Sequence, residues 1–118
     1  MSSNRRAQPL RDIRENLDAI VDFTTGMTLV TYVRDRKTRY AVTRALEIIS
    51  EASRRLPDAL KTRHPAIDWT GIAAVGNIYR HAYDVVDETL VWHTIQYDLA
   101  PLRAVIVAEL SRIDPPTS

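Results

Sequence analysis

Residues 35–56, DRKTRYAVTRALEIISEASRRL, form the longest uninterrupted amphipathic stretch of the chain. Apolar side chains recur every three or four positions, and charged side chains occupy many of the positions between them. The repeating series runs Val42, Ala45, Ile49, Ala52 and Leu56. Because an α-helix turns once in about 3.6 residues, this spacing places the series on one face over about six turns. The stretch therefore predicts a long helix with one buried side.

The rest of the chain repeats this pattern in other segments, and strand-like alternation over five or more residues is hard to find. Further helices are predicted over residues 10–24, 28–33, 58–63, 69–83 and 87–113. Short connections favour antiparallel packing of consecutive helices. We therefore predict an all-α fold, an antiparallel bundle of four to five helices.

Residues that start or stop helices mark the predicted boundaries. Gly26 is typical of a position just past a helix end, and Thr28 and Asp87 are typical N-caps. The pair His64-Pro65 indicates a loop, because the residue before a proline avoids helical geometry. Pro101 predicts a kink inside the last helix.

The composition is that of one globular domain. The chain has 118 residues, of which 45% are hydrophobic and 26% charged, and its net charge is +1. A chain of this length holds one hydrophobic core. We place the domain at residues 10–113, between flexible tails at 1–9 and 114–118. No stretch is apolar enough for a membrane span or a signal peptide, which predicts a cytoplasmic protein.

Metal and thiol chemistry are not expected. Cysteine is absent, which excludes disulfides and thiolate ligands. The three histidines lack the H-x-x-x-H spacing of a common metal site, and only scattered carboxylates accompany them. We therefore predict no bound metal and no cofactor.

Residues 77–83, NIYRHAY, are the densest cluster of chemically active side chains in the chain. On a helix, Asn77 and His81 share one face, and Arg80 and Tyr83 share a neighbouring one. An imidazole can transfer protons near neutral pH, and a guanidinium can hold a phosphate. These groups suit phosphodiester cleavage without metal. The same spacing also fits His81 and Tyr83 packed in a helix–helix interface with satisfied hydrogen bonds.

The order of several motifs along the chain is similar to that of a known family. They are Gly26-Met27-Thr28, Asp35-Arg36-Lys37-Thr38, RALEIISEA at 44–52, His64-Pro65 with Trp69, residues 77–83, and Val91-Trp92. Over about residues 10–110 the chain resembles the HepT-like family of the HEPN superfamily. The resemblance implies a ribonuclease toxin that forms a homodimer with its cleft at the dimer interface. It also implies a MntA-type nucleotidyltransferase antitoxin, encoded beside the toxin, that can add AMP to Tyr83.

The chain departs from the family motif, R-N-x-x-x-H-x-Y, at its first position. Counting back from His81 places the motif asparagine at Asn77 and the motif tyrosine at Tyr83, but the arginine expected to bind the scissile phosphate is replaced by Gly76. Removing one preorganised charge stabiliser typically slows a reaction by on the order of hundreds-fold. An uncompensated Gly76 therefore predicts a weakened nuclease.

Arg80 is the candidate replacement within the motif. It lies one helical turn after Gly76, so its long side chain could bend back into the space that the glycine leaves. The competing expectation is that Arg80 pairs with Glu47 or Glu51 of the long helix and that catalysis has been lost. Both alternatives remain open at the level of the sequence.

The resemblance and the local spacing together predict a metal-independent endoribonuclease acting on RNA. In this mechanism His81 is the general acid or base, Arg80 stabilises the charge of the transition state, and Asn77 and Tyr83 orient the phosphate or His81. The alternative is a catalytically impaired HEPN-fold binding module, which dimerises and binds the antitoxin without cleaving RNA.

Overall fold

The computed structural model describes residues 3–81 and 87–113, which form seven helices joined by short loops. The helices are α1 (Ser3–Thr24), α2 (Leu29–Arg34), α3 (Arg36–Arg54), α4 (Asp58–Arg63), α5 (Trp69–His81), α6 (Glu88–Tyr97) and α7 (Leu99–Ile113). Within those two ranges no residue lies in a strand. The predicted all-α bundle is confirmed.

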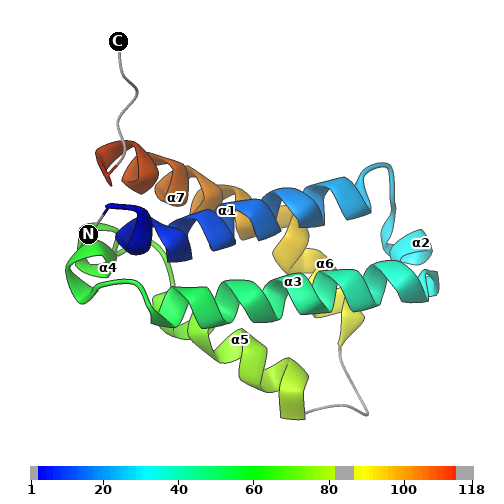
Figure 1. The fold of residues 1–118 in the computed structure, drawn as a ribbon. Coiled ribbons are helices and arrows are strands. Elements are labelled where there is room, and N and C mark those ends of the chain that lie inside the picture. The colour runs from blue at the N-terminus through cyan, green and yellow to red at the C-terminus, as the bar shows by residue number, and fades with distance from the viewer. Residues whose placement is uncertain (1–2, 82–86, 114–118) are drawn as a thin grey trace.

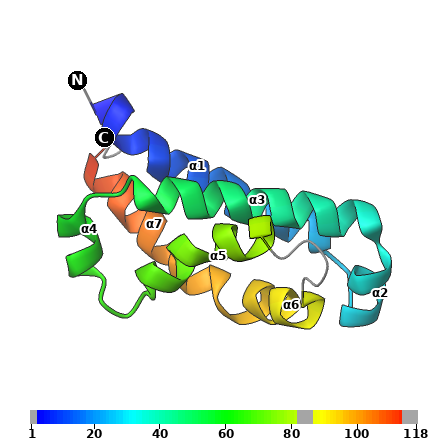
Figure 2. The ribbon, with the colours of Figure 1, turned by 90° about the horizontal axis from the view of Figure 1, so that it is seen from below.

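The pair α1 and α3 forms the centre of the bundle. The two helices run antiparallel, α7 packs on α1, and α5 packs on α3 and runs back along it (Figure 1). Near the start of α3, α2 contacts both α3 and α6. The second view shows α6 between α2 and the start of α7 (Figure 2). Every long helix thus covers an apolar face of a neighbour.

The helix α3 follows the predicted apolar stripe. Val42, Ala45, Ile49, Ala52 and Leu56 are all buried, although Leu56 lies two residues past the helix end. Full burial of a valine, leucine or isoleucine side chain contributes roughly 1.5–3 kcal/mol. This stripe is therefore a main source of stability for the bundle.

Helix ends are set by the capping residues that the sequence indicated. The Thr28 hydroxyl accepts a hydrogen bond from the Thr31 N–H at 3.2 Å, and Asp87 Oδ1 accepts from the Thr89 N–H at 3.0 Å. Asp35, which was predicted to lie inside the long helix, is instead its N-cap, with Oδ1 3.1 Å from the Thr38 N–H. Gly26, just past α1, has φ 78°, a left-handed conformation that glycine adopts without steric cost.

The first helix begins earlier than predicted. It starts at Ser3, and its 22 residues make it longer than α3, which has 19. Ala7 and Leu10 are fully buried, and Pro9 lies inside the helix. The predicted flexible tail over residues 1–9 is therefore wrong from Ser3 onward. Pro9 gives up one backbone hydrogen bond near the helix start, and burial of its neighbours outweighs that loss.

The last predicted helix is two helices. Asp98 is the C-cap of α6, and α7 begins at Leu99. The helix is therefore interrupted before Pro101 and does not bend at it. Pro101 falls in the first turn of α7, where a missing N–H removes no helical hydrogen bond. The predicted kink is corrected to a break at Asp98. The predicted tail at 114–118 lies outside the described residues.

Polar and aromatic contacts join α2 to α6. The buried Tyr32 donates its hydroxyl to Glu88 Oε2 at 2.9 Å, and its ring centroid lies 5.3 Å from that of Trp92. None of the described helices is long and apolar enough to cross a membrane.

Candidate functional site

The candidate motif lies on α5. The predicted helix over residues 69–83 is confirmed for Trp69–His81, so Asn77, Arg80 and His81 share one helix. Tyr83 lies outside the described residues. The helix places the motif within its last two turns.

The register of α5 separates the motif positions into two stripes. Positions 77 and 81 continue the spacing of Thr70 and Ala74, and those two residues are exposed. Positions 76 and 80 continue the spacing of Trp69 and Ala73, which are half-buried. Asn77 and His81 therefore fall in register with the exposed side of α5, and Gly76 and Arg80 fall in register with its packed side.

Two side chains of α3 bind the start of α5. Ser50 Oγ donates to the carbonyl oxygen of Ala73 at 2.8 Å, and Arg54 Nη2 donates to the same oxygen at 2.8 Å. These bonds fix which turns of α3 and α5 lie side by side. Because the two helices run antiparallel, the later turns of α5 lie beside the earlier turns of α3.

The competing expectation for Arg80 named two acids on α3. One of them, Glu51, already forms an ion pair with Arg54, with Nη1 and Oε2 3.1 Å apart. The pairing of Arg80 with Glu47 or Glu51 stays a prediction.

The capping residue of α5 explains one of its two glycines. Asp68 Oδ1 accepts a hydrogen bond from the Gly71 N–H at 3.0 Å. A Cβ atom at Gly71 would collide with the Asp68 carboxylate, so a side chain there would displace the cap. A larger residue at position 71 would therefore weaken this cap by moving the Asp68 carboxylate.

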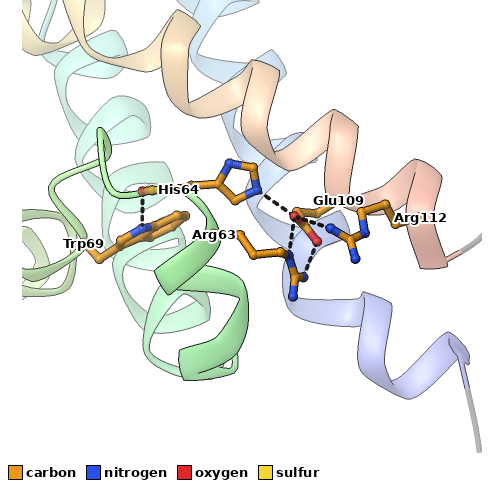
Figure 3. A network of polar contacts seen from close by, with 5 residues as sticks. All are labelled: Arg63, His64, Trp69, Glu109 and Arg112. Carbon is orange, nitrogen blue, oxygen red and sulfur yellow. Dashed lines mark hydrogen bonds and ion pairs between the residues drawn. The ribbon is translucent and has the colours of Figure 1, made fainter.

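An ion-pair network centred on the buried Glu109 lies before the start of α5 (Figure 3). Glu109 of α7, which is 1% exposed, accepts hydrogen bonds from Arg63 Nη2 at 2.7 Å and from His64 Nε2 at 2.6 Å. Arg112 Nη1 lies 3.9 Å from Glu109 Oε2. The His64 carbonyl accepts from Trp69 Nε1 at 3.1 Å. The network thus connects α7, the end of α4 and the first residue of α5.

The hydrogen bond from Arg63 lowers the pKa of Glu109 below its ordinary value of 4.5, and burial acts in the opposite direction. Glu109 is therefore ionised at neutral pH and holds the end of α4 by charge. Sequence reasoning missed it, although a signal was present: Glu109 lies three residues after Ile106 and seven after Leu102, on a buried stripe. An acid in register with such a stripe indicates a buried ion pair.

Arg39, the last residue of the basic run at residues 34–39, lies in the first turns of α3. Its side chain is half-buried, and its Nε atom is buried without a hydrogen-bond partner. Asp35, one turn earlier, caps the helix through Thr38. Buried polar atoms are almost always hydrogen-bonded, so Arg39 is an exception that calls for an explanation.

A third side of α5 lines an apolar groove. The groove, of about 420 Å³, lies between α3, α5 and the α6–α7 junction. Ile72 and Val75 of α5 face Leu46 and Ile49 of α3 there. Over the described ranges no group of three or more His, Asp or Glu side chains is placed to hold a metal ion.

The ribonuclease HepT-like family matches this chain over residues 13–109, which include α5 and most of the bundle. The chain belongs to that family. A protein of Thermococcus cleftensis named as a probable ribonuclease HepT is 39% identical over 94 residues, covering 80% of this chain and 86% of the relative.

Two further HepT-like relatives come from Methanocaldococcus jannaschii, and each is named as a putative RNase. One is 36% identical, covering 73% of this chain and 71% of the relative. The other is 32% identical, covering 80% of this chain and 78% of the relative. No solved structure is significantly similar to the chain.

Proposed function

We propose that this HepT-like protein is the toxin of a toxin–antitoxin pair and that it cleaves RNA without a metal ion. Membership of a ribonuclease family supports this function. The observation that carries it is the register of α5, in which Asn77 and His81 lie one turn apart on the stripe continued from exposed residues. A long RNA chain can approach such a stripe.

In the proposed reaction His81 removes the proton from a ribose 2′-hydroxyl. The 2′-oxygen forms a bond to the adjacent phosphorus, and the bond from phosphorus to the 5′-oxygen of the next nucleotide breaks. A protonated acid supplies a proton to that leaving oxygen. The products are a 2′,3′-cyclic phosphate and a 5′-hydroxyl. An imidazole suits this role because its ordinary pKa lies near neutral pH.

The other motif residues act on the phosphate. Arg80 stabilises the negative charge that grows on the phosphorus centre, and Asn77 and Tyr83 orient the phosphate or His81. Each chain contributes a single His81, so proton transfer at both ends of the reaction is best served by a homodimer with two copies at one cleft. A monomer in sedimentation at micromolar concentration would contradict the dimer.

The proposed antitoxin is a nucleotidyltransferase that silences the site by AMPylation. The Tyr83 hydroxyl attacks the α-phosphorus of ATP, pyrophosphate leaves, and AMP stays on the tyrosine. The added bulk and negative charge would occupy the place of the RNA phosphate. An intact mass that is unchanged after incubation with the antitoxin and ATP would contradict this step.

A second candidate function follows from Gly76. Without the motif arginine the chain would be a binding module, which dimerises and binds the antitoxin without cleaving RNA. Its signature would be a stable complex with the nucleotidyltransferase and no RNA cleavage by the freed protein.

The deciding experiment measures cleavage of labelled RNA in EDTA by antitoxin-free protein. His81→Ala should lower the rate at least a hundred-fold, because general acid–base catalysis contributes about 10²–10⁴. His93→Ala is the matched control: His93 is exposed on α6, with its ring against Tyr97, and its loss should leave the rate unchanged. Equal cleavage by the parent and His81→Ala would contradict the mechanism. If the parent protein does not cleave RNA, the result would favour the binding module.

A further inference from the structure

The long helix α3 carries an arginine, Arg39, with one guanidinium nitrogen that is buried without a hydrogen-bond partner among the described residues. Arg39 is half-buried, and its Nε is buried with no hydrogen bond. Other arginines of the described ranges bind acids: Arg55 binds Asp12, Arg63 binds Glu109 and Arg103 binds Asp18. A buried donor without an acceptor destabilises the fold, and an acceptor from outside the chain would satisfy it.

The register of α3 places Arg39 on the side that faces α5. Arg39 lies seven residues before Leu46 and eleven before Ser50, which are close to two and three helical turns. Ser50 binds the Ala73 carbonyl of α5, and Leu46 lines the groove shared with α5. Arg39 therefore belongs to the stripe of α3 that packs on α5.

The same register brings Arg39 toward the motif end of α5. From Ser50 back to Arg39 is about 16 Å along α3, and from Ala73 to His81 is about 12 Å along α5. Figure 1 shows α5 running back at an angle to α3, so from this one contact both segments extend toward the same side of the bundle. Arg39 therefore lies on the same side of this contact as the motif end of α5.

We propose that Arg39 is a second phosphate-binding guanidinium of the RNA site, supplied by α3 where position 76 of α5 offers none. This inference rests on the proposed function. A guanidinium holds a phosphate through two parallel hydrogen bonds, which suits a scissile phosphodiester in its charged transition state. Arg39 and Arg80 then act from two helices on one phosphate.

Other basic residues nearby are less suited to this role. Arg36, Lys37 and Arg44 are exposed on α3. Arg36 donates to the Tyr40 hydroxyl at 3.2 Å and lies 5.2 Å from the centroid of its ring. Arg36 therefore provides a matched control of equal charge on the same helix.

The test compares Arg39→Met with Arg36→Met in RNA cleavage and in thermal unfolding. Arg39→Met should lower the cleavage rate about a hundred-fold, because it removes a preorganised charge stabiliser. Its melting temperature should not fall, because the substitution also removes a buried donor without a partner. Arg36→Met should change the rate less than threefold. Arg39→Lys keeps the charge but loses the paired donors, so its cleavage rate should lie between those of Arg39→Met and the parent.

A second readout uses a 2′-O-methyl oligoribonucleotide, which cannot be cleaved. For single strands, each phosphate contact contributes about −0.7 to the slope of log K against log salt. Arg39→Met should reduce that slope by about 0.7, and Arg36→Met should not. If cleavage depends on His81 while Arg39→Met and Arg36→Met behave alike in both assays, the Arg39 proposal is overturned and the function stands. If the parent is silent but Arg39→Met alone weakens binding, the phosphate contact stands and cleavage fails.

Discussion

The two ends of α5 differ in how they are held. The α5 start, residues 69–73, receives bonds from three sides: Trp69 donates to the His64 carbonyl, Asp68 caps the helix, and Ser50 and Arg54 bind the Ala73 carbonyl. The α5 end, residues 76–81, carries the motif and begins with a helix-weakening glycine. Under the proposed function, one helix has its structural contacts at the start and its reactive groups at the end. Substitutions at the start should alter unfolding, and those at the end should alter the reaction.

The largest effect on stability should come from Glu109→Ala, which removes the network before the α5 start. It leaves Arg63 and His64 without their carboxylate and should lower the free energy of unfolding by about 2–3 kcal/mol. The loss stays below that of a fully buried pair because Arg63 is 39% exposed and regains water. Urea unfolding would measure it, and cleavage per folded molecule should stay near that of the parent.

Glu51→Ala is the matched control, because the Glu51 side chain is 57% exposed in its ion pair and that of Glu109 is 2% exposed. It should change the free energy of unfolding by less than about 1 kcal/mol.

The pH dependence of stability provides a second check on the contribution of Glu109. The pKa of Glu109 is lower in the folded protein than its ordinary 4.5, so its stabilisation is complete above about pH 4.5 and is lost as the pH falls through the folded pKa. The difference between the parent and Glu109→Gln should shrink over that range; a difference independent of pH would contradict this account.

At the α5 end, Gly76→Arg should raise the cleavage rate about tenfold or more, equivalent to about 1.4 kcal/mol per factor of ten. The substitution returns the motif guanidinium to its usual position. Gly76→Ala is the control, since it gives the same helix propensity gain of roughly 1 kcal/mol without the charge. Equal rates for the arginine and alanine variants, measured with labelled RNA, would show that position 76 does not contact the phosphate.

The smallest effect should come from Asp68→Ala, which removes the cap of α5. Loss of an N-cap costs about 1 kcal/mol, so the melting temperature should fall by a few degrees while cleavage is unchanged. Asp98→Ala, at the exposed C-cap of α6, should stay within about 0.5 kcal/mol of the parent. A large loss of cleavage in Asp68→Ala with normal stability would contradict the separation of the two ends.

Most of the fold could be predicted from the sequence because many helices and caps depend on local sequence patterns. The stripe of α3 and the caps Thr28, Asp35 and Asp87 depend on residues within one or two turns. The start of α1 and the break at Asp98 could not be predicted in this way. Both depend on tertiary packing: the burial of Ala7 and Leu10 supports the early start of α1, and the apolar pattern continues across the α6–α7 break.

The candidate site was predictable as a segment and not as a set of contacts. The sequence predicted a helix over this segment, and α5 includes Asn77 and His81; their shared role stays a prediction. It could not show that Glu109 is buried or that Arg39 lacks a partner, because both facts depend on residues distant in the sequence. Helical spacing alone, applied to charged residues within buried stripes, would have selected both positions for closer attention.

The two tryptophans give this small protein a pair of internal optical reporters. Trp69 lies against the His64 loop, and Trp92 stacks near Tyr32 between α2 and α6. Their indole emission samples opposite parts of the bundle without any attached dye. Replacing either indole with phenylalanine would leave a single tryptophan emitter. Comparing the two single-tryptophan variants would then show which part of the bundle unfolds first.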